Sequence, residues 1–117
     1  MSKKAGPEKQ LQNSILTWCK GNAIFAFPIQ NGGIYDPVKK LFRRPSKNFM
    51  PGISDILGLH KGKMFALELK HGKYTKPTPE QDRFLRRVIE DGGYSAVIRS
   101  FEEFEIFIQK ILAQKEV

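Results

Sequence analysis

The sequence from Pro51 to Lys70 reads PGISDILGLHKGKMFALELK, and this stretch decides the fold. It contains two apolar segments, residues 53–60 and 63–70, with the length and composition of β-strands. The residues between them, 60–63, predict a tight hairpin. Alternation along the second segment divides its side chains between two faces, with Met64, Ala66, Glu68 and Lys70 on one and Phe65, Leu67 and Leu69 on the other.

Two acids and a lysine interrupt these apolar segments. Glu68 and Lys70 point the same way, about 7 Å apart at the rise of a strand, and Asp55 lies near the start of the neighbouring strand. Two carboxylates and the backbone carbonyl of Leu69 are hard oxygen ligands of the kind that Mg²⁺ prefers. A divalent ion there would lower the pKa of a bound water and neutralise charge on a phosphodiester. Lys70 would orient that water or stabilise the transition state.

The alternative interpretation of Glu68 and Lys70 is an ordinary surface ion pair, worth under about 1 kcal/mol. The composition of the strand argues against it, because charges are rare among apolar residues unless they are paired or bound. We therefore favour the metal site.

Composition favours a nucleic acid as the partner. Twenty Lys and Arg residues against twelve Asp and Glu residues give the 117-residue chain a net charge of +8, although an anionic membrane surface attracts the same charge. The length suits one domain, residues 1–117, with residues 1–6 loose. No apolar run is long enough to span a bilayer, and no signal peptide is visible. The single Cys19 excludes an internal disulfide and favours a reducing, cytoplasmic location. The small size and the lack of a targeting segment suit a bacterial or phage protein.

The first half of the chain predicts a helix, a strand and a long basic loop. Apolar residues at helical spacing follow Pro7 and end before Gly21, and a strand is expected over 23–29. The loop 31–51 is rich in cations, namely Lys39, Lys40, Arg43, Arg44 and Lys47. These cations favour DNA contact over a merely solvated loop, and Phe42 or Phe49 would stack on an unpaired base.

The second half predicts a helix, a strand and a helix. Thr78 and Gln81 form a capping box, a strand is expected over 94–99, and Ser100 caps the last helix. The order helix, three strands, helix, strand, helix indicates an α/β domain. The apolar stripes of the first and last helices are candidates for a dimer contact, and we interpret Tyr74 and Trp18 as packing residues.

The ordered set Gly52-x-Ser54-Asp55, Glu68-x-Lys70 and Pro79-x-Gln81 resembles the PD-(D/E)XK nuclease superfamily. Within it, the chain is most similar to the small stand-alone form of the VRR-NUC domain. The match runs from about Glu8 to the fourth strand. Ser54 stands where the superfamily has its name-giving proline.

The resemblance implies a restriction-endonuclease-like αβββαβ core, with a mixed sheet flanked by helices. It also implies Mg²⁺- or Mn²⁺-dependent hydrolysis of DNA by a homodimer similar to Holliday-junction resolvases. Carried over by position, Asp55 and Glu68 become metal ligands and Lys70 the catalytic amine. Glu8 matches the acid of the first helix and Gln81 a helix-borne glutamine. Each of these last two has a structural alternative, because Glu8 favours the helix dipole and Gln81 closes the capping box.

The site residues together with this resemblance predict a metal-dependent endonuclease, and the resemblance implies branched DNA, with four-way junctions as the expected substrate. The alternatives are a nuclease acting on flaps, nicked duplex or RNA, and a basic DNA-binding module without catalysis.

Overall fold

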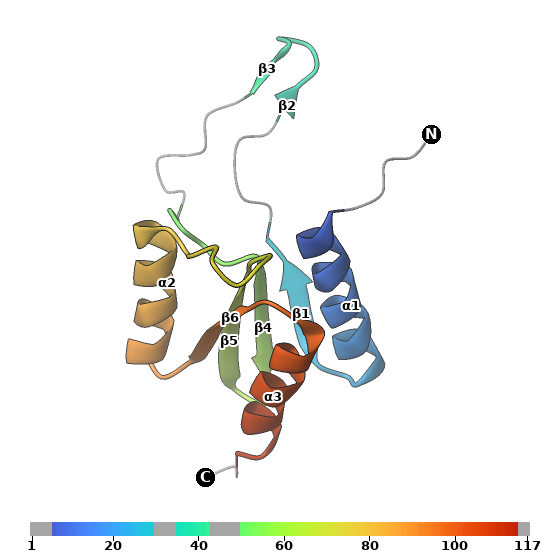
Figure 1. Cartoon of the computed structure of the whole chain (residues 1–117), viewed down its shortest axis with the longest axis vertical. Helices are drawn as coiled ribbons and strands as arrows, with labels where there is room; N and C mark the ends of the chain where they lie inside the picture. The colour runs from blue at the N-terminus through green and yellow to red at the C-terminus, as the bar shows by residue number, and fades with distance from the viewer. Residues whose placement is uncertain (1–5, 30–34, 43–49, 115–117) are drawn as a thin grey trace.

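The chain folds into three layers, with a sheet between helices (Figure 1). The computed structural model describes residues 6–29, 35–42 and 50–114. The helices in these ranges are α1 (Pro7–Gly21), α2 (Pro79–Glu90) and α3 (Phe101–Leu112). The strands are β1 (Phe25–Pro28), β2 (Tyr35–Asp36), β3 (Leu41–Phe42), β4 (Ile56–His60), β5 (Lys63–Leu69) and β6 (Tyr94–Ile98). This is the α/β class that the sequence predicts, and no helix in the described ranges has the length and apolar character needed to cross a membrane.

The main sheet is mixed, as expected. Its strand order is β1-β4-β5-β6, with antiparallel pairing from β1 to β5 and parallel pairing of β6 with β5. The crossover through α2 makes this parallel pair possible, since parallel strands need a long connection. Ile56 lies opposite Leu67, and Glu68 lies opposite Val97.

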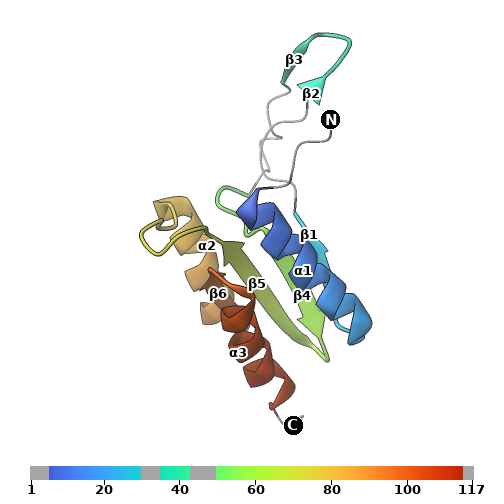
Figure 2. The same ribbon diagram turned by 45° about the vertical axis from the view of Figure 1, so that its right-hand side comes forward.

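One face of the sheet is covered by α1 and α3, which lie on the same side of it (Figure 2). The core between them is formed by Ile15, Cys19, Ile24, Ile56, Phe65, Leu67, Leu69, Ile98, Phe104, Ile108 and Ile111. Trp18 packs edge-to-face against Phe104, with 5.4 Å between the ring centroids, so its predicted packing role is confirmed. The central residues of both helix stripes are buried in the core of a single chain, which argues against the dimer contact expected there; these residues are Ile15, Cys19, Phe104, Ile108 and Ile111.

Among the described residues, the other face is covered by α2, and only in part. Ala66 packs there with Leu85 and Val88, and α2 contacts β5 and β6. The predicted division of side chains along β5 is therefore confirmed: Ala66 faces α2, whereas Phe65 and Leu67 face the other two helices. On the α2 side, β1 and β4 carry exposed apolar residues.

The expected loop 31–51 contains a short hairpin that the sequence did not indicate. Tyr35 pairs with Phe42 and Asp36 with Leu41, and the exposed Lys39 and Lys40 lie in the turn between them. Only local pairing forms this hairpin, so no hydrophobic periodicity predicts it. Arg43, Arg44, Lys47 and Phe49 lie outside the described residues.

Candidate active site

The predicted site residues gather at one edge of the main sheet. Strands β1 and β5 end at this edge, β4 begins there, and the N-termini of α1 and α2 lie beside it (Figure 1). Ligand sites of α/β folds commonly lie at such an edge, where strand ends and helix N-termini meet. The β2–β3 hairpin is drawn beyond the same edge in Figures 1 and 2.

Asp55 precedes β4, and its backbone continues the sheet, since the Ile29 N–H donates to the Asp55 carbonyl at 2.8 Å. The β4–β5 register, continued one residue beyond Ile56 and Leu67, places Asp55 opposite Glu68. The backbone N–H of Leu69 donates to Asp55 Oδ2 at 2.7 Å. This bond fixes the carboxylate beside the end of β5 and leaves Oδ1 for another partner.

Glu68 is a buried acid with incomplete hydrogen bonding. Its side chain is 2% exposed, on the face of β5 that α2 covers. Oε1 accepts a hydrogen bond from Gln81 Nε2 at 2.7 Å and lies 3.6 Å from Lys70 Nζ. Oε2 is buried and has no hydrogen-bond partner among the residues that the structure describes. An unsatisfied buried carboxylate oxygen is costly in a native fold, so this atom indicates a missing positive partner.

The charge state of Glu68 reflects this environment. Burial and, next, the neighbouring Asp55 carboxylate together raise the pKa of its carboxyl from 4.5 to about 8, while Lys70 partly opposes both effects. Two carboxyl groups this close hydrogen bond to each other only if one is protonated. A bound cation would remove that requirement, because it favours both ionised forms.

Gln81 takes part in two structures at once. Its backbone N–H and side-chain Oε1 form the capping box with Thr78, at 3.2 and 2.8 Å. Its Nε2 is left to hold Glu68. The sequence presented capping and the site as alternatives, whereas the structure shows that one side chain makes both sets of contacts.

Gly52 sets the distance between α2 and the strand that follows Asp55. It has a φ of +73°, and a Cβ at this position would lie 2.3 Å from the backbone carbon and oxygen of Glu80. Only glycine permits this approach, which brings Gln81 within reach of Glu68. The sequence offered Gly52 as part of a motif but gave no sign of this contact.

The remaining predicted residues are less closely associated with Asp55, Glu68 and Lys70. Glu8 is exposed in the first turn of α1. Within the described part of the chain, it is not among the hydrogen-bond or ion-pair partners of Asp55 and Glu68. Ser54 is fully buried, and its hydroxyl has no hydrogen-bond partner in the described ranges. No group of three or more His, Cys, Asp or Glu side chains that would enclose a metal occurs among the described residues.

Two features were missed or misjudged in the sequence. Tyr74, interpreted as a packing residue, is 85% exposed, so that prediction is wrong. The apolar face of β1 and β4 was not anticipated. Its signal was present, since Phe25, Phe27, Leu57 and Leu59 alternate with Ala or Gly and not with charged residues.

Comparison with known proteins places the fold. The solved structure of a "VRR_NUC domain protein" matches with a TM-score of 0.55 at 16% sequence identity, covering 92% of this chain and 89% of that one. At this identity the likeness shows a shared fold. No protein-family model and no curated protein matches the sequence.

Proposed function

We propose that this chain is a metal-dependent endonuclease that hydrolyses phosphodiesters of branched DNA. The observation that carries the proposal is the buried, unsatisfied Oε2 of Glu68, which lies at a sheet edge beside Asp55 and Lys70. Strongly perturbed pKa values cluster at functional sites, and the raised pKa of this buried acid agrees with such a role. The fold shared with a VRR_NUC domain protein agrees with a nuclease domain.

The residues present fit a divalent cation such as Mg²⁺ or Mn²⁺. Asp55 and Glu68 would hold it through their free oxygens, with the Leu69 backbone carbonyl as a further ligand. Mg²⁺ commonly keeps several waters and takes only one or two carboxylates, so a third acidic side chain is not needed. When bound, the cation supplies Lewis acidity toward the phosphate and promotes ionisation of an attacking water.

The protein side chains account for the other requirements of hydrolysis. Lys70, whose side chain is 13% exposed, is placed to donate to the attacking water or to a phosphate oxygen as negative charge develops. Gln81 acts as a positioning residue, because its bond to Oε1 fixes the orientation of the Glu68 carboxylate. Glu8 lies on the same edge and is assigned a supporting role near the cation.

The charge distribution favours a phosphate polymer, and we propose that this polymer is DNA. The net charge of +8 supplies general affinity for phosphates. Lys39 and Lys40 are exposed at the turn of the hairpin beyond the site edge, and Arg43, Arg44 and Lys47 follow in sequence. We assign these five cations to the DNA backbone.

The uncovered half of the sheet suits a second copy of the chain. The register places Phe25 opposite Leu59 and Phe27 opposite Leu57, so all four side chains point to one face. Phe25 is 65% exposed and packs edge-to-face with Phe27, at 5.4 Å between centroids. Exposed apolar areas of this kind usually mark an interface.

On the same side of the sheet, Met64 of β5 and the residues of α2 border a pocket of about 460 Å³. Its lining combines the apolar Met50, Met64, Phe84 and Val88 with the charged Glu80, Arg83, Arg87 and Asp91. The aromatic pair and the pocket therefore occupy one face of one chain. We propose that in a two-fold dimer the aromatic pair of each copy packs against this face of the other copy, a self-complementary arrangement. Two copies would present two sites, which matches the two-fold symmetry of a four-way junction.

The oligomer is tested with one substitution on this face. Phe27→Asp should convert the dimer to a monomer in sedimentation equilibrium, because it buries a charge in an apolar contact. Ile106→Asp is the matched control, since Ile106 is an equally apolar, exposed residue of α3. A Phe27→Asp protein of the same mass in solution as wild type would exclude this interface.

The activity is tested by cleavage of a labelled four-way junction, a flap, a nicked duplex, a linear duplex and an RNA hairpin with Mg²⁺ or Mn²⁺. Paired symmetric cuts in the junction are expected, and they should disappear in Lys70→Ala and Glu68→Gln while binding persists. Lys110→Ala serves as the control, because Lys110 is an exposed cation of α3. Binding without metal-dependent cutting of any substrate would favour the non-catalytic DNA-binding module. Cutting of flaps, nicked duplex or RNA alone would support the proposed active site but would show that the four-way junction is not the substrate.

A further inference from the structure

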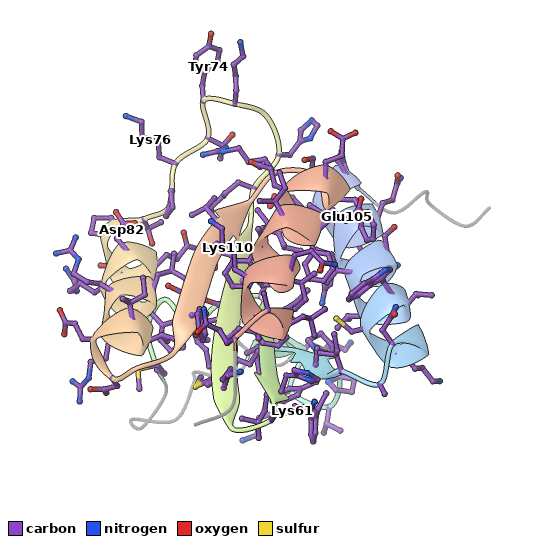
Figure 3. The ribbon with its side chains drawn as sticks, turned by 90° about the horizontal axis from the view of Figure 1, so that it is seen from below. Lys61, Tyr74, Lys76, Asp82, Glu105 and Lys110 are labelled. Carbon is purple, nitrogen blue, oxygen red and sulfur yellow. The ribbon has the colours of Figure 1, made fainter. Side chains whose placement is uncertain are left out.

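The connection between β5 and α2 presents an exposed aromatic ring among cations. Tyr74 is 85% exposed, and Figure 3 shows its side chain at the tip of this loop, directed away from the sheet and the helices. Lys76, also labelled there, lies on the segment that returns to α2. Residues 69–79 contain no acid, and the exposed residues of the loop include His71, Lys73 and Lys76.

Hydrogen bonds within and around the loop set its shape. Thr75 Oγ1 donates to the His71 carbonyl at 2.7 Å, and the Arg99 guanidinium donates to the Gly72 carbonyl. Gly72 adopts a φ of +81°, which favours glycine. The loop is thus a turn whose shape is held by these hydrogen bonds. Tyr74 lies at its tip, and the exposure of the ring follows from the shape of the turn.

Both ends of the loop are connected to the candidate active site. It leaves β5 directly after Lys70, which lies 3.6 Å from Glu68 Oε1. It enters α2 at Thr78, whose capping partner Gln81 binds the same oxygen of Glu68. Tyr74 therefore belongs to the segment that connects Lys70 and Gln81, the two residues whose side chains contact Glu68 Oε1.

The chemistry of the ring and its neighbours suits a nucleobase. Lys73 Nζ lies 5.8 Å from the centroid of the Tyr74 ring, so the π-face already accepts a cation. An aromatic face flanked by lysines is how proteins hold single-stranded nucleic acid, with the ring on a base and the cations on phosphates. In a continuous duplex each base face is covered by its stacked neighbours, whereas branch points and gaps offer free faces.

We propose that Tyr74 stacks on an unpaired or unstacked base of DNA next to the cleavage site, while Lys73 and Lys76 contact the adjacent phosphates. This proposal rests on the proposed function in that DNA is the substrate. It deepens that function by assigning to one ring the preference for branched over continuous DNA.

The test is a binding measurement without cleavage. Wild type, Tyr74→Ala, Tyr74→Phe, Lys76→Ala and the control Lys110→Ala are titrated in EDTA against two DNAs of equal length. One is a continuous duplex, and the other carries unpaired 2-aminopurine at a branch. Anisotropy gives the affinity and 2-aminopurine fluorescence reports stacking. Vesicles of phosphatidylserine and phosphatidylcholine in equal parts are titrated in parallel.

Tyr74→Ala should weaken binding to the branched DNA by about tenfold, the usual effect of removing one base-stacking ring, and should abolish the fluorescence quench. Its affinity for the duplex should stay within about twofold of wild type, and Tyr74→Phe should retain both properties. Lys76→Ala should weaken both DNAs equally and reduce the salt dependence.

Equal weakening of both DNAs by Tyr74→Ala, or no effect on either, would overturn the stacking role. So would Tyr74-dependent binding to the vesicles in place of DNA. If Lys70-dependent cleavage exists but Tyr74→Ala binds branched DNA normally, the stacking proposal fails alone. If wild type cuts nothing and the tenfold effect still appears, the stacking role stands and the nuclease activity fails.

Discussion

Replacing Glu68 with Gln should stabilise the metal-free protein at neutral and alkaline pH while abolishing cleavage. Glu68 is 2% exposed, and its pKa is raised from 4.5 to about 8 by burial and by Asp55. The folded state therefore holds a proton that the unfolded state releases between these two values. Stability from this group is fully present below about pH 4.5 and is lost as pH rises through about 8.

The magnitude follows from the linkage relation. For one carboxyl group with these two pKa values, the free energy of unfolding falls by ~3 kcal/mol between pH 5 and pH 8. Gln keeps the oxygen that accepts from Gln81, and it places an amide N–H₂ where Oε2 lacks a partner. The amide would donate toward the Asp55 carboxylate, so repulsion between two carboxylates is replaced by attraction.

The assay is urea unfolding of wild type and Glu68→Gln in EDTA at several pH values and constant ionic strength. The difference between the two proteins isolates Glu68, because the other titrating groups are common to both. That difference should grow from near zero at pH 5 to ~3 kcal/mol in favour of the variant at pH 8. A difference that is independent of pH, or that favours wild type more strongly as pH rises, would refute the assignment of Glu68 as a desolvated acid.

Three further predictions concern the surroundings of the site. Gly52→Ala should destabilise the fold by ~2 kcal/mol or more in urea unfolding, because its Cβ meets the Glu80 backbone at 2.3 Å. Gly62→Ala, with a similar positive φ and open space, should lose only ~1 kcal/mol, and equal losses would exclude the clash. Gln81→Met should weaken Mn²⁺ binding by about tenfold in calorimetry. Thr78→Ala, which removes only the helix cap, should bind Mn²⁺ as tightly as wild type does. Equal weakening in both variants would show that Gln81 acts only as a capping residue. Ser54→Ala should leave the free energy of unfolding unchanged or raise it by up to ~1 kcal/mol, because the buried hydroxyl has no partner, and a marked loss would reveal an unrecognised bond.

Local chemistry in the sequence determined most of the secondary structure. The hairpin at 60–63, the capping box of Thr78 and Gln81, and the Ser100 cap are short-range features, and each is present. The period-2 pattern of β5 also predicted which side chains share a face, and hence that Glu68 and Lys70 lie together. The β2–β3 hairpin escaped prediction because its pairing covers only two residues per strand.

The sequence alone therefore determined the α/β class, the order of the main elements and the set of residues that gather at one edge. Only the tertiary structure decided which of them touch. The Gln81–Glu68 bond depends on how closely α2 approaches Gly52, a distance that no local pattern records. Tertiary structure likewise decided which apolar surfaces remain uncovered, because α1 and α3 bury their stripes in the core while α2 covers only part of its face of the sheet. The sequence does not distinguish an apolar residue that packs inside its own chain from one that remains exposed for contact with another chain.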